Sequence, residues 1–234
     1  MTEINSLRGF LKPLFLLFLI SILIMGQPDL GSTAIVCILV VGILFYAGIS
    51  FSQLCLLILL ISLLGYLAIT TSPMRIARVL AFTDPFAADV VLNAGWQLSN
   101  SLISIGQGGW FGVGLGNSFQ KSFYLPEAHT DYIISVISEE FGVVAIMLIL
   151  LLFLIFIYMV FKKISFETND KAKLILIGSI SLILMQATIH IGVNIRLFPT
   201  TGMTLPFLSY GGSSIISTSI LAGIILNLTK RKIT

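Results

Sequence analysis

Six long apolar runs, separated by short polar breaks, dominate the pattern of the chain. They cover residues 10–27, 32–49, 53–70, 132–161, 172–195 and 206–228. A helix needs about 20 mostly apolar residues to cross the hydrocarbon core of a bilayer. The pattern therefore predicts about six membrane-spanning helices.

Composition strengthens this interpretation. Of the 234 residues, 57% are hydrophobic and only 10% are charged, and the mean hydropathy is +1.06. Soluble domains carry about 25% charged residues, so lipid must face much of this chain. The predicted fold is an all-α polytopic transmembrane helix bundle, with residues 1–234 in a single membrane domain. The small net charge of +3 comes without a basic, aromatic-rich stripe, so nothing favours nucleic acid as a partner.

The interval 71–131 differs from the rest of the chain. It contains prolines, charged residues and a glycine cluster at 106–116. These residues predict one large extramembrane or re-entrant loop. Within it, residues 94–105 have the apolar spacing of a helix, which could lie along the membrane surface.

The distribution of Lys and Arg predicts the orientation in the membrane. Loops on the cytoplasmic side carry an excess of these residues. With both termini in the cytoplasm, nine of the 13 would lie inside, at positions 8, 12, 162, 163, 171, 173, 230, 231 and 232. Four would lie outside, at positions 75, 78, 121 and 196. We therefore expect cytoplasmic termini and an outward-facing 71–131 loop.

Asp131 stands directly before the fourth apolar run, where the helix is expected to begin near Thr130 or Asp131. Its carboxylate is either a helix N-cap or a general base at a membrane boundary. Ionisable residues beside a span are costly and often functional. Glu127 and His129 lie in the same segment and are candidates for contacting a substrate; a structural, hydrogen-bonded role is the alternative for His129.

Glu139 follows Asp131 by eight residues and falls close to the same helix face. Ser135 and Ser138 join it in one polar stripe, whereas Glu140 points to the other side. The stripe could line a polar cavity in which Glu139 contacts substrate. Alternatively, it joins helices by hydrogen bonds.

A third polar group begins at Asn194, at the end of the fifth run, and extends to the sequence PFLSYGGSS at 206–214. Ser209 and Ser213 offer hydroxyls, and Arg196 could bind an anionic phosphate or snorkel to the membrane interface. Irregular backbone at membrane depth is tolerated only against protein or a water-filled cavity. Acids, hydroxyls and an arginine at one face suit a lipid-linked polar substrate, and they would suit a transporter as well.

Seven stretches over nearly the whole chain resemble motifs of the SEDS family (shape, elongation, division and sporulation). They are QPDLGST (27–33), GWQLSNSLIS (95–104), the glycine cluster (106–116), NSFQK (117–121), YLPEAHTDY (124–132), SEEFG (138–142) and NIRLFPTTGMTLPFLSYGGSS (194–214). The wording around GLGNSFQK (114–121) and LPEAHTDY (125–132) resembles the members that act in cell division more than those that act in elongation. The family has about ten spans, and residues 6–13 resemble the approach to its fifth. The chain is therefore expected to correspond to the C-terminal six-span portion.

The resemblance implies a peptidoglycan glycosyltransferase, a hexosyltransferase that polymerises lipid II during division. Lipid II is an undecaprenyl-pyrophosphate-linked disaccharide peptide, and the site would face outward from the bacterial cytoplasmic (inner) membrane. The implied partners are a class B penicillin-binding protein, which is a transpeptidase, and other division proteins. The family's essential acid carries over onto Asp131.

The departing pyrophosphate needs positive charge, which Arg196 or a divalent cation such as Mg²⁺ or Mn²⁺ could supply. No residue is assigned to a metal. Arg196 stands where the family pattern has a small or apolar residue, so its role is inferred from its chemistry alone.

Two other functions remain open at this point. A lipid II flippase needs a polar path across the bilayer, which Glu139 and Glu140 could join, whereas a polymerase needs only an outward-facing site. A truncated, non-catalytic division scaffold is the third possibility, because about four family spans would be missing.

Overall fold

The computed structural model describes residues 7–27, 29–88 and 90–230. All regular structure within these ranges is helical, which confirms the predicted all-α class. In chain order the helices are α1 (Leu7–Met25), α2 (Leu30–Tyr46), α3 (Phe51–Thr70), α4 (Pro73–Thr83), α5 (Trp96–Gly108), α6 (Phe119–Phe123), α7 (Ile133–Phe166), α8 (Asp170–Asn194) and α9 (Gly212–Lys230).

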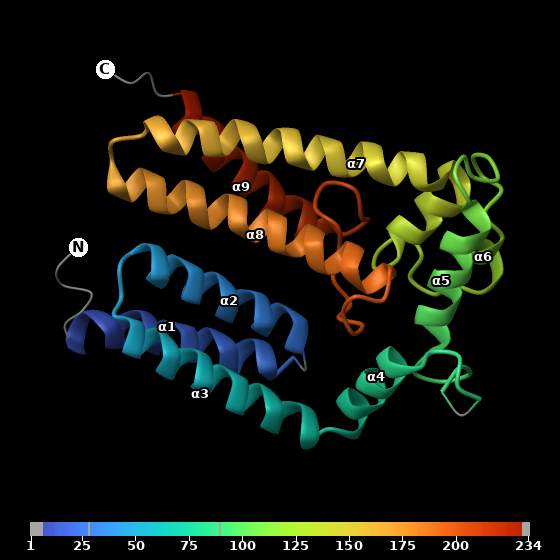
Figure 1. Ribbon diagram of the computed structural model, residues 1–234, viewed down its shortest axis with the longest axis horizontal. Coiled ribbons are helices and arrows are strands. Elements are labelled where there is room, and N and C mark those ends of the chain that lie inside the picture. The colour runs from blue at the N-terminus through green and yellow to red at the C-terminus, as the bar shows by residue number, and fades with distance from the viewer. Residues whose placement is uncertain (1–6, 28, 89, 231–234) are drawn as a thin grey trace.

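The long helices form two groups that lie side by side (Figure 1). Helices α1, α2 and α3 form one group, and α7, α8 and α9 form the other; α2 packs against α8 and joins them. The short helices α4, α5 and α6 gather at one end of the bundle, which we call the loop end. The described chain begins in α1 and finishes in α9 at the opposite end.

Four of the described helices are long and apolar enough to cross a membrane, namely α3, α7, α8 and α9. Helices α1 and α2 contain shorter apolar stretches. Large apolar side chains are exposed along several of them, for example Phe15 at 66% and Leu59 at 66%, as lipid-facing positions require. The chain is therefore a polytopic membrane helix bundle, while the count of six crossings stays a prediction.

Two helix boundaries differ from those expected. Helix α7 begins at Ile133 rather than at Thr130 or Asp131. Helix α9 begins at Gly212, six residues after the start of the predicted run. Residues 206–209 form a turn instead, in which Phe207 has a φ of +67° and the Leu205 N–H donates to the Ser209 hydroxyl at 2.7 Å.

The interval 71–131 is a folded segment rather than a plain loop. Helix α5 confirms the helix expected at 94–105, and it packs against α7. Helix α4 begins with Pro73 at its first turn, where the missing N–H of proline costs nothing. The Arg75 guanidinium donates to the Ala68 carbonyl at 2.7 Å, which ties α4 to the end of α3.

Helix α7 is broken at Gly142, whose φ of +76° and ψ of −177° are not helical. The glycine-rich loop after α5 completes the hydrogen bonding that the break leaves open. Val113 and Gly114 N–H donate to the Glu139 and Glu140 carbonyls, at 2.8 and 3.0 Å. In the other direction, the N–H groups of residues 143 and 144 donate to the carbonyls of residues 109 and 110. The glycine cluster therefore pairs with the broken helix through backbone hydrogen bonds in both directions.

Candidate active site

Asp131 lies at the loop end, two residues before α7 and half-buried. Tyr132 occupies the N-cap position of that helix, and no side chain caps it. The carboxylate of Asp131 is therefore not engaged as the cap that the sequence offered as an alternative. It is left beside Gly202, where an added Cβ would lie 3.5 Å from its Oδ2 atom.

The backbone around Asp131 is fixed by Asn194, the last residue of α8, which is fully buried. The Asn194 Nδ2 group donates to the Asp131 carbonyl at 3.1 Å and to the His190 carbonyl at 2.8 Å. Its Oδ1 atom accepts from the Ser135 hydroxyl at 2.6 Å. The asparagine amide thus joins α8, α7 and the Asp131 segment with every polar atom used.

The turn at 206–210 fixes the same segment from the other side. The Ser209 hydroxyl donates to the Thr130 carbonyl at 2.7 Å, and the Tyr210 N–H donates to the His129 carbonyl at 2.9 Å. Asp131 therefore sits in a stretch of backbone held by two segments far away in sequence. Preorganisation of this kind is what a reacting group needs.

The surroundings of the Asp131 carboxyl favour its neutral form more than bulk water does. Burial raises the pKa of the Asp131 carboxyl above its ordinary value, and the nearby Glu127 carboxylate raises it further. The Thr130 hydroxyl and the Arg78 guanidinium act in the opposite direction but do not cancel the rise. A carboxylate with a raised pKa is a stronger base, which suits proton abstraction.

Glu139 is 1% exposed and lies among groups of α5 and α6. Its Oε2 atom accepts from the Ser104 and Ser118 hydroxyls at 2.7 and 2.6 Å. Its Oε1 atom accepts from the N–H groups of Phe119 and Gln120 at 2.8 and 3.3 Å. Four protein donors surround this carboxylate, which favours a structural role over the predicted contact with substrate.

Glu140 forms a salt bridge with Lys121, with 2.6 Å between Nζ and Oε1. Both acids of the SEEFG motif therefore attach α6 and its flanks to the first part of α7. They lie on the loop-end side of the Gly142 break. The rest of the apolar run that begins at residue 132, residues 143–161, carries no charged side chain.

The other predicted site residues differ in exposure and in hydrogen bonding. Glu127 and His129 are exposed in the same segment, and Glu127 has a φ of +56°. Ser213 is exposed in the first turn of α9, whereas the Ser209 hydroxyl is buried and already engaged. Their contacts with a substrate stay predictions.

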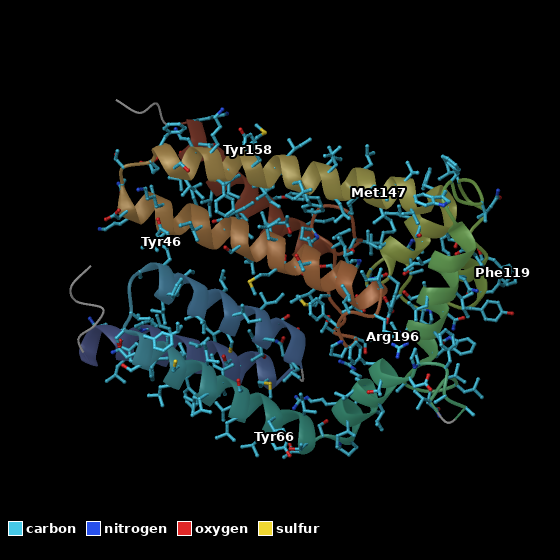
Figure 2. The ribbon with its side chains drawn as sticks, viewed as in Figure 1. Tyr46, Tyr66, Phe119, Met147, Tyr158 and Arg196 are labelled. Atoms are coloured by element: carbon cyan, nitrogen blue, oxygen red, sulfur yellow. The ribbon has the colours of Figure 1, made fainter. Side chains whose placement is uncertain are left out.

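Arg196 lies at the end of α4, as Figure 2 shows. Its Nε atom donates to the Phe82 carbonyl at 3.0 Å, and its Nη2 atom donates to the Thr83 carbonyl. A cation at a helix C-terminus satisfies the last carbonyls and the helix dipole. The residue is exposed, so donors remain for an anion, and the predicted phosphate contact stays a prediction.

Sequence reasoning missed two residues of this site. Arg78 of α4 interacts electrostatically with Asp131 across 53 positions of sequence, and no local signal announces that proximity. Asn194 was recognised as part of a polar segment, but no role was predicted for its side chain. An asparagine at the end of a long apolar run, as here, was the one signal available for it.

The described residues contain no group of three or more His, Cys, Asp or Glu that could bind a metal ion. Asp131 and Glu127 are the acids that interact in this region. A divalent cation beside them would need its other ligands from water or from a substrate's phosphate oxygens.

Residues 2–233 match the model of the family described as cell cycle protein, which groups FtsW, RodA and SpoVE. The chain belongs to this family. The resemblance found in the motifs is thereby confirmed.

Relatives within the FtsW/RodA/SpoVE family are similar over nearly the whole chain. The probable peptidoglycan glycosyltransferase FtsW of Alcanivorax borkumensis is 41% identical over 94% of this chain and 57% of its own length. The protein of the same name from Taylorella equigenitalis is 41% identical over 97% of this chain and 62% of its own. The chain thus spans about three fifths of the length of the curated relatives it matches.

One solved structure has the same arrangement of helices. It is described as "Structural coordination of polymerization and crosslinking by a peptidoglycan synthase complex". The TM-score is 0.73 with 27% identity, over 97% of this chain and 62% of the solved one. By its description, that structure is of a peptidoglycan synthase complex.

Proposed function

We propose that this chain carries the active site of a peptidoglycan glycosyltransferase that polymerises lipid II, with Asp131 as the general base. The observation that supports it best is the half-buried Asp131 carboxylate on a backbone held by Asn194 and Ser209. The names of the relatives supply the reaction class. We place the site at the outer face of the bacterial cytoplasmic membrane, with both chain ends in the cytoplasm.

The proposed step transfers one sugar chain to another. Asp131 accepts the proton of the 4-hydroxyl of the acceptor sugar as that oxygen attacks the anomeric carbon of the donor. The bond from this carbon to the pyrophosphate oxygen breaks, and polyprenyl pyrophosphate leaves with the electron pair. Arg78 and Arg196 lie on the α4 side of the site and are the cations available to the leaving group.

A test compares two equivalent substitutions, with the class B penicillin-binding protein proposed as partner present in both. Asp131→Asn keeps the size of the side chain but removes the base, so polymerisation of labelled lipid II should fall by about 10² to 10⁴. Asp84→Asn makes the same change at an exposed position after α4 and should leave the rate unchanged. Equal rates for Asp131→Asn and the unaltered chain would contradict the proposal.

The flippase alternative is less well supported. Glu139 and Glu140 are engaged by protein groups at the loop end, and α7 beyond Gly142 offers no charged path. If Asp131→Asn retains lipid II transport while losing polymerisation, the two activities are separate. A non-catalytic scaffold would not polymerise lipid II, either as the unaltered chain or as the Asp131→Asn variant.

A further inference from the structure

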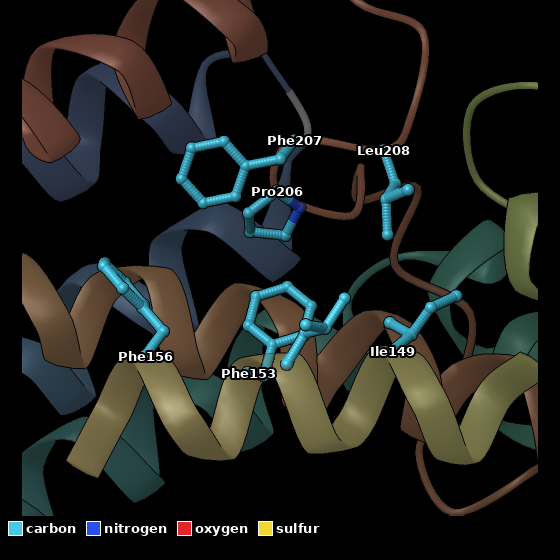
Figure 3. A pocket seen from close by; sticks show the side chains of 7 residues that line it. Ile149, Phe153, Phe156, Pro206, Phe207 and Leu208 are labelled. Atoms are coloured by element: carbon cyan, nitrogen blue, oxygen red, sulfur yellow. The ribbon is translucent and has the colours of Figure 1, made fainter. Parts of the chain in front are cut away.

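An apolar groove of about 310 Å³ lies between the middle of α7 and the turn at 206–208. Its lining is Ile149, Leu152, Phe153, Phe156, Pro206, Phe207 and Leu208. Figure 3 shows the rings of α7 facing Pro206 and Phe207 across the groove. Its volume is at the lower end of the range for ligand pockets, about 300–1,000 Å³.

The depth of the groove excludes polar ligands. Helix α7 rises about 1.5 Å per residue, so its wall lies about 10 to 21 Å beyond the break at Gly142. Lys162 follows that break by 20 residues, about 30 Å, which equals the hydrocarbon thickness of a bilayer. With Gly142 taken as the edge of the hydrocarbon layer, the groove lies within that layer, where a sugar or phosphate would lose its hydration.

The far wall of the groove is continuous with the candidate active site. Phe207 and Leu208 form this wall, and the next two residues are Ser209 and Tyr210, which bond to the carbonyls of Thr130 and His129. Whatever occupies the groove therefore contacts the same turn that fixes the Asp131 segment.

The backbone of the turn is unusual in a way that ligand clamps often show. Phe207 is not a glycine, yet its φ is +67°, and such residues cluster at functional sites. The turn is held by the Leu208 and Ser209 N–H groups, which donate to the Leu205 carbonyl at 3.3 and 3.0 Å. This conformation places the half-exposed Phe207 ring in the groove wall.

We infer that the groove binds the isoprenoid chain of the lipid-linked substrate and so directs its pyrophosphate end toward Asp131. The inference rests on the proposed function for the identity of the substrate. Three aromatic rings, those of Phe153, Phe156 and Phe207, line the groove. The flat, methyl-branched units of an isoprenoid chain pack against such rings better than a flexible saturated acyl chain does.

The test uses the purified chain and a polyprenyl phosphate with a photoreactive group on its hydrocarbon chain. After irradiation, labelled peptides are mapped by mass spectrometry. Labelling should fall within 149–156 or 206–208, and excess unlabelled polyprenyl phosphate should suppress it while phosphatidylglycerol does not. Equal competition by phosphatidylglycerol, or labelling elsewhere, would overturn the inference.

Two tryptophan variants sharpen this test. Leu152→Trp fills the groove, and labelling should fall about tenfold, equivalent to about 1.4 kcal/mol, or nearly two buried methylene groups. Leu154→Trp makes the same change at an exposed α7 position outside the groove and should label normally. Equal labelling of the two variants would overturn the inference.

The binding readout requires no catalysis, so the two proposals can fail separately. If Asp131→Asn is labelled in the groove but does not polymerise, both proposals stand. If the unaltered chain is labelled there but Asp131→Asn polymerises normally, only the general-base proposal falls. If adding the transmembrane helix of the transpeptidase to the purified chain abolishes labelling, the groove is a protein interface and the inference is wrong.

Discussion

Asp131 owes its position to hydrogen bonds accepted by the backbone carbonyls of residues 130 and 131 rather than to bonds of its carboxylate. The Asn194 amide and the Ser209 hydroxyl donate to the carbonyls of residues 131 and 130. The half-buried carboxylate, which interacts with the Thr130 hydroxyl and the Arg78 guanidinium, is not needed to hold the segment in place. In a preorganised base, some groups fix the position of the residue and another group reacts; here the backbone carbonyls do the first and the carboxylate the second.

Replacing Asn194 with leucine should impair catalysis through Asp131. The carbonyls of Asp131 and His190 and the Ser135 hydroxyl would lose a partner, at about 1–3 kcal/mol for each buried group. The segment should then relax toward water, which lowers the pKa of the Asp131 carboxyl and moves the acid limb of the pH–rate profile to lower pH. Asn117→Leu, which removes one bond in an exposed loop, is the control. A slower enzyme with an unmoved profile would show that Asn194 serves stability alone.

The pH dependence should respond in opposite directions to two charge removals near Asp131. The base works only when ionised, so activity is present above the raised pKa of Asp131 and is lost as pH falls through it. Glu127→Gln removes an effect that raises the pKa, so the acid limb should move to lower pH. Arg78→Gln removes an effect that lowers it, so the limb should move to higher pH. Profiles of kcat/KM across pH 4 to 8 measure both shifts, and parallel shifts would contradict the assignment.

The candidate acid itself could be found in the sequence, because a charged residue beside an apolar run is costly and therefore conspicuous. Its surroundings could not. Asn194 is 63 residues from Asp131 and Arg78 is 53 residues away, so their contacts depend on how the helices pack. Glu139 shows the same limit: helical spacing placed it with Asp131, but the donors around its carboxylate come from α5 and the start of α6.

Helix α7 and the glycine loop form a single structural unit that neither segment could form alone. A break in a helix exposes carbonyl and N–H groups that cost free energy inside a membrane protein. The loop residues 109–114 satisfy these groups in both directions. Close approach of two backbones leaves no room for side chains: a Cβ on Gly142 would lie 2.2 Å from the Trp110 carbonyl oxygen.

Gly142→Ala should therefore destabilise the loop end strongly. The φ and ψ of Gly142 belong to a region that only glycine occupies readily, at about 1–3 kcal/mol for any other residue, and the clash with Trp110 adds to this. Gly106→Ala, in the last turn of α5 with open space around it, should be neutral or stabilising by up to about 1 kcal/mol. Thermal unfolding of the two variants in the same detergent measures the difference, and equal melting temperatures would mean that the break is not required.

Apolar runs predicted where helices form but not where they break. The run at 132–161 looks continuous because nothing in its sequence interrupts the helical pattern, and a lone glycine within it gives little warning. The turn at 206–209 was hidden for a similar reason, since PFL reads as the start of an apolar helix. Both features depend on hydrogen bonds to distant segments, such as the bonds from Ser209 to Thr130 and from Val113 to Glu139.

The molecule as a whole separates its chemistry from its lipid-facing surface. The acids and hydroxyls of the site, with Arg78 and Arg196, lie at the loop end with α4, α5 and α6. At the opposite end, the connection between α7 and α8 is flanked by Lys162 and Lys163 of α7 and by Lys171 of α8. The excess of positive charge at that end favours the cytoplasm, which would place Asp131 outside.

This orientation can be tested in intact cells with single cysteines in a chain whose Cys37 and Cys55 are replaced by serine. Asn117 and Thr168 are exposed at opposite ends of the bundle. A membrane-impermeant maleimide should modify Asn117→Cys directly and Thr168→Cys only after the cells are permeabilised. The reverse pattern would place Asp131 in the cytoplasm, where a lipid-linked acceptor already moved outward could not reach it. The polymerase proposal would then fall even if Asp131 proved essential, because a base on the wrong side of the membrane cannot extend a glycan strand in the wall.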